Sequence, residues 1–319
     1  MAIPLFAGRI IAVIWDFDQT LIPGYMQKPL FEEYGVDAAD FWREVNKLAE
    51  HYRKEGIQVS PDTIYLNHIL TYVQGGKFQG LTNSKLRDLG AKLEFYPGMP
   101  EFLDEARAAI ESDERYKKHD IKVEHYVVST GLRQVILGSA ISNKVNGVWG
   151  CEFIEAPAPP GYLEAEGAAQ ATEHVVSQVG YFLDNTTKTR AIWEINKGTN
   201  VDEHIGVNDK IAPDLRRVPI PNMIYVADGP SDIPVFSILN EYGGQTLGVH
   251  NGSEAHYQAV RRLESQGRVK HFTAADYRPE ADAYRWIMAT LKDVADKIVE
   301  TRDRLRIDEV GPSARHVTD

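Results

Sequence analysis

Short runs of consecutive apolar residues alternate with longer amphipathic stretches along most of the chain. The apolar runs contain β-branched residues and predict strands buried on both faces of a parallel sheet. They cover residues 10–15, 123–129, 222–229 and 244–250. The amphipathic stretches predict helices at 98–112, 187–198 and 254–267. Strands and helices that alternate in this way are typical of an α/β fold with a doubly wound parallel sheet.

Residues 24–95 interrupt this alternation with helical periodicity. Segments 39–56 and 61–76 are amphipathic, and the second ends in paired glycines. Turn-forming residues flank the insert, which leaves directly after the first predicted strand. Ligands of open α/β sheets bind at the carboxyl ends of strands, so this insert is expected to lie over the site as a lid.

The rest of the pattern predicts the other parts of the chain. Residues 277–304 carry an apolar helical stripe expected to pack on the core, with an oligomer interface as the alternative. Segment 155–180, rich in Pro, Gly and Ala, is expected to form an excursion or flap, and the last dozen polar residues to fray. The predicted division is a core at 1–23 and 96–276, a helical cap at 24–95, and a C-terminal helix and tail at 277–319.

Composition and charge narrow the class of protein. The 319 residues are 43% hydrophobic and 25% charged, as in soluble globular proteins. A net charge of −11 repels nucleic acid and anionic membranes, so neither is an expected partner. The single Cys151 excludes an intrachain disulfide and a cysteine metal cluster, and it suits a cytoplasmic location. Arg9 and Asp16 interrupt the apolar N-terminus, which favours a buried strand over a secretion signal.

Candidate chemistry is concentrated where the predicted strands end. Asp-x-Asp after a strand can simply cap a turn, so this motif alone decides little. Further polar residues, however, follow the later strands, and a lysine opens the helix between them. The full set is Asp16, Asp18, Thr20, Ser129, Thr130, Gly131, Lys188, Asp228 and Asp232. The ten histidines have no ligand spacing and are interpreted as ordinary surface or core residues.

This ordered set resembles the signature motifs of the haloacid dehalogenase (HAD) superfamily. Residues 16–20 match Asp-x-Asp-x-Thr, Ser129 ends the second strand, Lys188 is the lone lysine, and residues 228–232 match Asp-Gly-x-x-Asp. The resemblance extends from residue 10 to about 235. It implies a Rossmann-like core, with the insert as a small helical C1 cap. The branch that it most resembles is that of the phosphoserine phosphatases.

The resemblance also implies roles. Asp16 would be the nucleophile that forms an aspartyl-phosphate, and Asp18 the acid and base that serves the leaving group and then water. Thr20, placed with the phosphate-binding residues, would brace the loop that orients Asp18. Mg²⁺ would be held by Asp16, the backbone carbonyl of Asp18 and Asp228, with Asp232 as a ligand or support.

Phosphate binding would come from Ser129 and the amides of Thr130 and Gly131, as the family pattern implies. Lys188 would add positive charge against the nucleophile and the phosphate, with Lys197 as a rival for this position. Asp232 could also cap the helix that follows it. Cys151 lies in an apolar context and is expected to be buried and inert.

The acid at position 18 favours phosphoryl transfer, because dehalogenases of the superfamily lack it. A phosphonatase-like activity would need a cap lysine, for which Lys28 is a poor candidate. Phosphoserine phosphatases typically carry a glutamate five residues after the motif threonine, where this chain has Tyr25. The substitution argues against phosphoserine and suggests an aromatic or apolar recognition surface that includes Tyr25 and Met26.

The predicted function is therefore Mg²⁺-dependent hydrolysis of a small phosphorylated metabolite. A phosphotransferase of the same family and a non-catalytic regulator that binds a phosphorylated ligand remain alternatives. A nucleotide-sugar glycosyltransferase would explain neither Thr20 nor the run at 228–232. Association of copies through the C-terminal helix is a further possibility.

Overall fold

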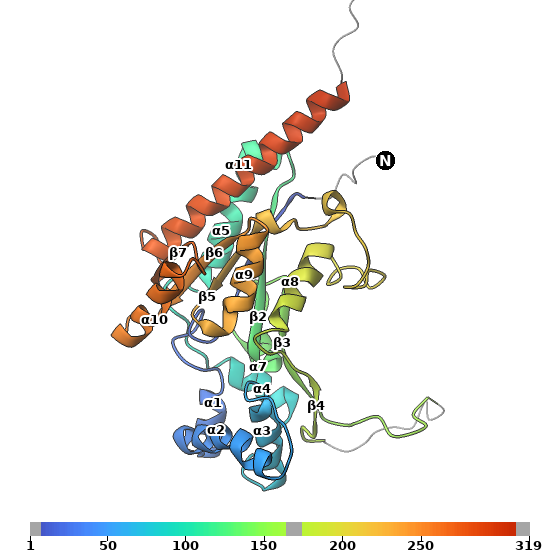
Figure 1. The fold of residues 1–319 in the computed structure, drawn as a ribbon, viewed down its shortest axis with the longest axis vertical. Coiled ribbons are helices and arrows are strands. Elements are labelled where there is room, and N and C mark those ends of the chain that lie inside the picture. Colours follow the sequence, from blue (N-terminus) through green and yellow to red (C-terminus); the bar gives the residue numbers. More distant parts are fainter. Residues whose placement is uncertain (1–7, 164–173, 311–319) are drawn as a thin grey trace, which may run out of the picture.

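A seven-stranded sheet forms the centre of the computed structural model, which describes residues 8–163 and 174–310 (Figure 1). The strand order is β4-β3-β2-β1-β5-β6-β7, and every neighbouring pair is parallel except β3 and β4. The strands are β1 (Ile10–Trp15), β2 (Lys122–Leu132), β3 (Gly147–Ile154), β4 (Gln178–Tyr181), β5 (Met223–Ala227), β6 (Gln245–His250) and β7 (His271–Ala274). The predicted α/β fold with a parallel sheet is confirmed.

Helices cover both faces of this sheet. Their bounds are α5 (Glu101–Glu111), α6 (Glu114–Lys117), α7 (Arg133–Gly138), α8 (Lys188–Lys197), α9 (Ile233–Glu241), α10 (Glu254–Ser265) and α11 (Asp282–Val310). Helix α5 packs against α11, and α8 packs against α9, on opposite sides of the central strands (Figure 1). Residues 11–15 of β1 are fully buried between these layers, which explains their continuous apolar run.

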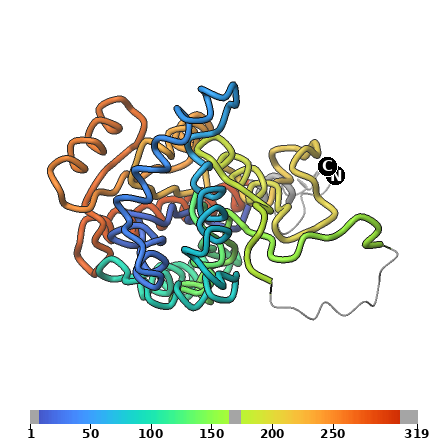
Figure 2. Tube along the Cα trace, turned by 90° about the horizontal axis from the view of Figure 1, so that it is seen from below, coloured from blue at the N-terminus to red at the C-terminus, as the bar shows by residue number. Residues whose placement is uncertain are grey.

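Three strands were not predicted. Strand β3 contains Gly147, Gly150 and Glu152, which break the apolar run, and β4 and β7 have four residues each. Strand β4 belongs to the segment that was predicted as an excursion. That prediction is wrong for residues 178–180, which belong to a strand that pairs antiparallel with β3, and residues 164–173 lie outside the described part. Figure 2 shows residues 155–163 running out on the side of the molecule opposite α10.

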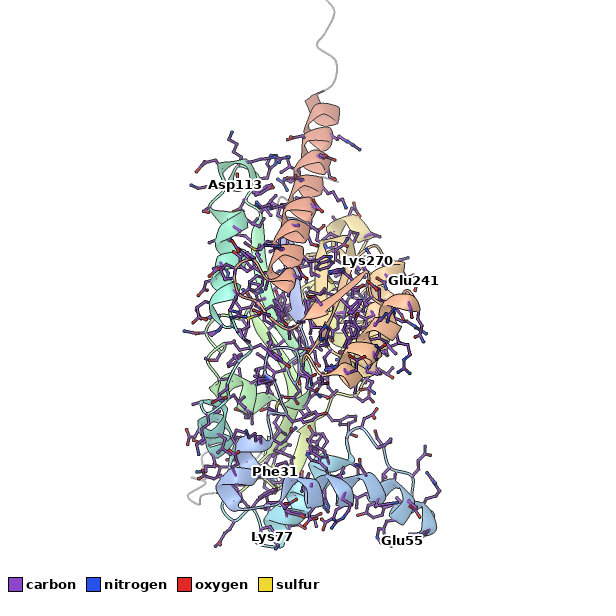
Figure 3. All side chains as sticks on the ribbon, turned by 90° about the vertical axis from the view of Figure 1, so that its left-hand side faces the viewer. Phe31, Glu55, Lys77, Asp113, Glu241 and Lys270 are labelled. Atoms are coloured by element: carbon purple, nitrogen blue, oxygen red, sulfur yellow. The ribbon has the colours of Figure 1, made fainter. Side chains whose placement is uncertain are left out.

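The insert between β1 and α5 is helical, as expected. It contains α1 (Lys28–Tyr34), α2 (Ala38–Lys54), α3 (Ile64–Gln74) and α4 (Asn83–Gly90), at one end of the molecule (Figure 3). Packed aromatic rings form its interior, among them Phe31, Phe41 and Phe78. The two linkers to the core lie side by side, because the amide of Tyr96 donates to the carbonyl oxygen of Leu21 at 2.9 Å.

Helix α4 docks closely on α7 of the core. A Cβ atom at Gly90 would lie 2.0 Å from the carbonyl oxygen of Val135, and one at Gly138 would lie 1.9 Å from that of Arg87. Only glycine permits this approach of two backbones. The Arg87 guanidinium also donates to the side chain of Gln134. The cap is therefore joined to the core through α4 as well as through its linkers.

Helix α11 begins five residues later than the predicted segment and is longer. Its buried residues include Ile287, Leu291 and Val294, which belong to the predicted stripe and face the core. The predicted fraying of the last dozen residues is wrong for 308–310, which are helical, and 311–319 lie outside the described part. Within the described residues, no helix combines the length and apolar character needed to span a bilayer.

His125 is a fully buried histidine in the middle of β2. Trp15 Nε1 donates to its Nδ1 at 3.2 Å, and its Nε2 lies 2.9 Å from the carbonyl oxygen of Leu103. This arrangement suits the neutral ring, with a proton on Nε2. Burial, with a smaller contribution from the charge of Arg107, lowers the pKa of His125 to about 3.

This histidine should make the protein less stable in mild acid. The unfolded chain takes up a proton on His125 below its ordinary pKa of 6.5, whereas the folded chain does so only near 3, so stability is lost as the pH falls through this window. Between pH 7 and 5 the contribution is about 2 kcal/mol. Urea unfolding of wild type and His125→Gln should differ by that amount in their pH dependence. Parallel pH profiles would contradict this expectation.

Candidate active site

The carboxyl ends of β2, β1 and β5 meet at one edge of the sheet. Trp15, the last residue of β1, pairs with Val127 of β2 and with Val226 of β5. The amide of Asp16 continues the ladder and donates to the carbonyl oxygen of Val226 at 2.9 Å. Ser129 and Asp228 each follow two residues after those partners. The register therefore brings together three motifs that are far apart in the sequence.

Three carboxylates form a compact cluster at this edge. Asp16, Asp228 and Asp232 each offer an oxygen, and these atoms all lie within 4.8 Å of one another. An all-oxygen, anionic donor set fits a hard divalent cation. The expected convergence of Asp16 and Asp228 is thus present. Asp18 was predicted to contribute its backbone carbonyl, and its carboxylate does not belong to this cluster.

Lys188 lies buried between two of these carboxylates. It is the first residue of α8, and its Nζ is 2.9 Å from Asp16 Oδ1 and 2.6 Å from Asp232 Oδ1. Lys197, the rival candidate, lies at the other end of α8 and donates to the carbonyl oxygens of Val207 and Asp209 at 2.5 and 2.7 Å. The structure therefore places Lys188, and not Lys197, at the cluster.

Asp232 is fully buried and receives several donors. Besides Lys188, the Tyr225 hydroxyl donates to its Oδ1 at 2.6 Å, and the Ser231 hydroxyl donates to its Oδ2 at 2.9 Å. Its side chain makes no capping hydrogen bond to α9, so the predicted capping role is wrong. The carboxylate is instead held toward Lys188 and the other acids.

Burial controls the ionisation of this cluster. It raises the pKa of Asp16 well above the ordinary value, against the attraction of Lys188 and together with repulsion from Asp232 and Asp228. Burial likewise raises the pKa of Asp228. Burial alone would lower the pKa of Lys188, but Asp16 and Asp232 raise it above the usual value. Lys188 therefore stays charged. A cation bound at the cluster would favour the ionised forms of Asp16 and Asp228.

Asp18 is oriented by a backbone amide. Its Oδ1 accepts a hydrogen bond from the amide of Met26 at 2.8 Å, and burial raises its pKa to about 7. The Thr20 hydroxyl is fully buried and, among the described residues, has no hydrogen-bond partner. Thr20 was predicted to brace the loop that orients Asp18, but its hydroxyl makes no such contact, and the hydrogen bond that orients Asp18 itself comes from Met26. Thr20 instead contributes its backbone, whose carbonyl accepts from the Tyr277 hydroxyl at 2.7 Å.

The second motif lies within the last residues of β2, beside the cap, where the pairing with β3 is irregular. The amide of Gly131 donates to Ser129 Oγ at 3.0 Å, and Ser129 is buried. The carbonyl of Thr130 accepts from the hydroxyl of Tyr65, a cap residue, at 2.7 Å, and from the Cys151 thiol at 3.2 Å. Cys151 is buried, as predicted, and burial raises the pKa of its thiol.

Tyr25 and Met26, predicted together as a recognition surface, lie in different environments. Tyr25 is 55% exposed, and its ring centroid is 6.5 Å from that of Trp42 in the cap. Met26 is fully buried, and its Sδ accepts from the amide of Leu132 at 3.0 Å. A Cβ at Gly131 would come within 2.2 Å of Met26 Cε. Met26 therefore packs the first motif loop on the second and offers a ligand no surface here.

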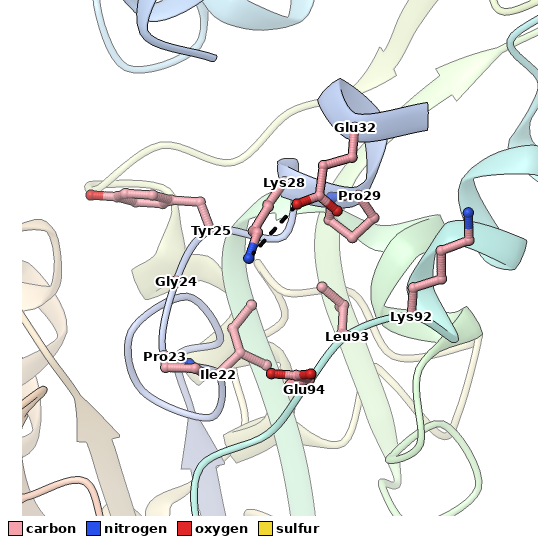
Figure 4. Close-up of a pocket in the computed structure, with 10 residues that line it drawn as sticks. All are labelled: Ile22, Pro23, Gly24, Tyr25, Lys28, Pro29, Glu32, Lys92, Leu93 and Glu94. Carbon is pink, nitrogen blue, oxygen red and sulfur yellow. Dashed lines mark ion pairs between the residues drawn. The ribbon is translucent and has the colours of Figure 1, made fainter. Parts of the chain in front are cut away.

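A cavity of about 250 Å³ lies between the two linkers of the cap (Figure 4). Its walls come from residues 22–25 and 92–94 and from α1, where Lys28 and Glu32 form an ion pair at 3.7 Å. None of the clustered aspartates lines it. The cavity is therefore separate from the acidic cluster, and Lys28 is directed to its own helix neighbour.

His256 is a site residue that sequence analysis missed. Its Nε2 lies 3.3 Å from Asp228 Oδ2 and 3.1 Å from the carbonyl oxygen of the same residue. Hydrogen bonding to Asp228 raises the pKa of His256. One signal was available: the predicted strand at 244–250 ends at the same edge as Asp228, and Ser253 caps a helix whose first turn contains His256.

Comparisons with known proteins show similarity in sequence and in fold. No family model matches the chain. It is 42% identical over 284 residues to an uncharacterized protein of Borreliella burgdorferi, covering 88% of this chain and 96% of that protein. The structure of a HAD family hydrolase from Salmonella enterica serovar Typhi matches with a TM-score of 0.50 and 10% identity, covering 84% and 67% of the two chains. A phosphoserine phosphatase with a phospho-aspartyl intermediate analogue has a TM-score of 0.45 and 14% identity, covering 83% and 93%.

Proposed function

We infer the function from two premises: the chain belongs to the family of the Borreliella burgdorferi protein, and it has the fold of the HAD hydrolases. We propose that it is a Mg²⁺-dependent phosphatase that hydrolyses a small phosphomonoester through an aspartyl-phosphate. One observation carries this proposal: the buried Lys188 bonds both Asp16 and Asp232, and one oxygen each of Asp16, Asp228 and Asp232 lies close enough to the others to share a metal ion. Carboxylates that only cap turns would not need to be buried together around a lysine that balances their charge.

Asp16 is the proposed nucleophile. One of its oxygens forms a bond to phosphorus while the bond from phosphorus to the ester oxygen breaks, which leaves an aspartyl-phosphate and an alcohol. Lys188 holds the carboxylate in place and opposes the repulsion between it and the phosphate. Water then attacks the phosphorus, phosphate leaves, and Asp16 is restored.

Asp18 is the proposed proton carrier. In the first step its protonated carboxyl gives a proton to the leaving ester oxygen, and in the second the carboxylate takes a proton from the attacking water. Its burial, and its pKa of about 7, suit a group that must exist in both states near neutral pH. The hydrogen bond from the amide of Met26 fixes one oxygen and leaves the other for this exchange.

The acidic cluster would hold Mg²⁺ through Asp16, Asp228 and the backbone carbonyl of Asp18. Asp232, already bonded to Lys188, Tyr225 and Ser231, would support the site. When bound, the ion would supply positive charge that offsets repulsion between the carboxylates and the phosphate. Ser129 and the amides of Thr130 and Gly131 would bind phosphoryl oxygens; for this the amide of Gly131 would leave Ser129 Oγ, to which it now donates.

The direct test is release of phosphate from a chromogenic aryl phosphate, with and without Mg²⁺. Turnover that requires the ion and is lost on chelation is expected. Turnover that is the same in EDTA would contradict the proposal, and binding of a phosphate ester without turnover would favour a regulator. Adding an alcohol and measuring the phosphorylated alcohol separates a phosphotransferase from a hydrolase.

Aromatic side chains suggest the kind of substrate. Tyr25 lies next to Trp42, whose ring centroid is 5.7 Å from that of Tyr65, and the Tyr65 hydroxyl bonds the second motif. These rings reach across the cap from the first motif to the second. We propose that they favour esters with a planar or apolar group.

At saturating Mg²⁺, Tyr25→Ala should therefore raise KM for an aryl phosphate about tenfold and leave kcat within about twofold. The KM for a small aliphatic phosphate should change little, because such a substrate does not reach the ring. Tyr242→Ala is the matched control, since Tyr242 is 49% exposed and follows α9 at the opposite edge of the sheet. Equal changes in KM for both substrates would contradict a role in recognition.

Other expectations stay predictions from the sequence. They are a cytoplasmic location, a small phosphorylated metabolite as partner, no nucleic-acid or membrane partner, association through the C-terminal helix, and the domain boundaries. Size-exclusion chromatography with light scattering would test the association.

A further inference from the structure

We propose that His256 is a positioning residue that fixes the Asp228 carboxylate for the divalent cation, and that Asn251 and Gln19 extend this hydrogen-bond chain to Tyr25. The inference rests on the proposed function only in assigning a cation to the acidic cluster. It adds His256 and Asn251, which lie outside the motifs, and Gln19, at a variable position of the first motif. It also connects the cluster to the linker that enters the cap.

The contact between His256 and Asp228 is largely buried and involves two oxygen atoms of Asp228. Nε2 lies 3.3 Å from the carboxylate and 3.1 Å from the carbonyl oxygen of Asp228. The two side chains are 14% and 15% exposed. A hydrogen bond shielded from water restricts the rotation of the carboxylate more than an exposed one does. The Asp228 carboxylate is then held in a fixed direction within the cluster that it forms with Asp16 and Asp232.

Asn251 determines which ring nitrogen of His256 carries the proton. Its backbone amide donates to His256 Nδ1 at 3.2 Å. Nδ1 must therefore be an acceptor in the neutral ring, which leaves the proton on Nε2, facing Asp228. The backbone of His256 is held at the start of α10, because its amide donates to the Ser253 hydroxyl at 3.3 Å. The ring is thus held in both position and tautomer.

Gln19 continues the chain into the first motif loop. It lies between Asp18 and Thr20 in the left-handed region, with φ of 56°. Its Oε1 accepts from Asn251 Nδ2 at 3.3 Å, and its Nε2 donates to the Tyr25 hydroxyl at 2.8 Å. Residues other than glycine seldom adopt this backbone conformation, which here directs the side chain between Asn251 and Tyr25. The loop that carries Asp18 is therefore tied to the same residue that holds His256.

The test is Mg²⁺ affinity, measured by titration calorimetry on the whole protein without substrate. The variants are His256→Gln and His256→Asn. Glutamine carries an amide nitrogen near the position of Nε2 and can still donate to Asp228, whereas the shorter asparagine cannot reach it. Mg²⁺ binding should weaken about 10- to 100-fold in His256→Asn and by less than about fivefold in His256→Gln.

His250→Asn is the matched control. His250 ends β6 six residues earlier, and its Nδ1 accepts from the amide of Gly252 without contact to Asp228. Its Mg²⁺ affinity should stay within about twofold of wild type. Equal losses in His250→Asn and His256→Asn, or wild-type affinity in His256→Asn, would overturn the positioning role. If wild type itself bound no Mg²⁺, both this inference and the proposed function would fail. If wild type bound Mg²⁺ and His256→Asn bound it equally well, only this inference would fail.

Tyr25→Phe tests the extension to the linker, since it removes the hydroxyl that Gln19 bonds and keeps the ring. Alone, it should weaken Mg²⁺ binding about threefold; in His256→Asn it should have no further effect, because the chain is already broken. Multiplicative losses in the double variant, or no loss in the single one, would overturn the extension to Tyr25.

Discussion

Asp16→Asn is expected to lower kcat for an aryl phosphate by roughly 10⁴-fold or more. The amide oxygen of asparagine is a poor nucleophile, and no other carboxylate can replace Asp16. Asp232 is bonded to Lys188, Tyr225 and Ser231. The Asp228 carboxylate pairs with His256. Neither is free to attack in line from the position of Asp16.

The loss should occur without unfolding. Asparagine has nearly the size of aspartate, and burial already disfavours the charged form of Asp16, so removing the charge costs the fold little. Initial rates of phosphate release should be measured with Mg²⁺ beside urea unfolding of the same samples. A variant that unfolds at a similar urea concentration but has no activity would support a chemical role.

Asp120→Asn is the matched control for this experiment. Asp120 precedes β2 at the opposite edge of the sheet, and its side chain is 57% exposed. It should keep wild-type activity, because its ion pair with Arg9 lies far from the cluster. Residual turnover in Asp16→Asn above a few per cent of wild type would contradict the nucleophile assignment.

Lys188→Met should abolish activity and also destabilise the protein by about 3–5 kcal/mol in the absence of Mg²⁺. The lysine is 1% exposed and bonds Asp16 and Asp232, so its removal leaves two buried carboxylates without their cation. Activity should fall by more than about 10³-fold, because the nucleophile is no longer held or its charge offset.

A double variant separates the two effects. In Lys188→Met/Asp232→Asn the second substitution removes one of the unpaired charges and keeps an acceptor for Tyr225, so it should recover most of the lost stability and none of the activity. Urea unfolding and phosphate release measure the two quantities. Recovery of activity along with stability would show that Lys188 acts only through the fold.

Lys197→Met is the control from the same helix. Lys197 bonds two carbonyl oxygens of the following loop, so its loss should cost roughly 1–3 kcal/mol and leave kcat within a few fold of wild type. Equal losses of activity in the two lysine variants would contradict the assignment of Lys188 to the cluster.

Local pattern was sufficient for the four adjacent strands β2, β1, β5 and β6 and for most of the motif residues. The buried run before Asp16 has the composition of a strand covered on both faces, and the alternation after residue 98 predicts a parallel sheet. Strand ends in a parallel sheet share one edge, so the convergence of Asp16, Ser129 and Asp228 followed from their spacing. Strands β3, β4 and β7 were missed because they lie toward or at the edges of the sheet and are short or interrupted by glycine.

The sequence alone thus determined the central strands, the helical character of the insert after β1, and which acids lie at one edge, because these depend on periodicity and chain order. Only the tertiary structure decided that Lys188 rather than Lys197 reaches Asp16, that the amide of Met26 orients Asp18, and that His256 bonds Asp228. These choices depend on side-chain direction and on contacts between segments that are distant in the sequence. No local pattern encodes them, because each partner is selected by the packing of the whole fold.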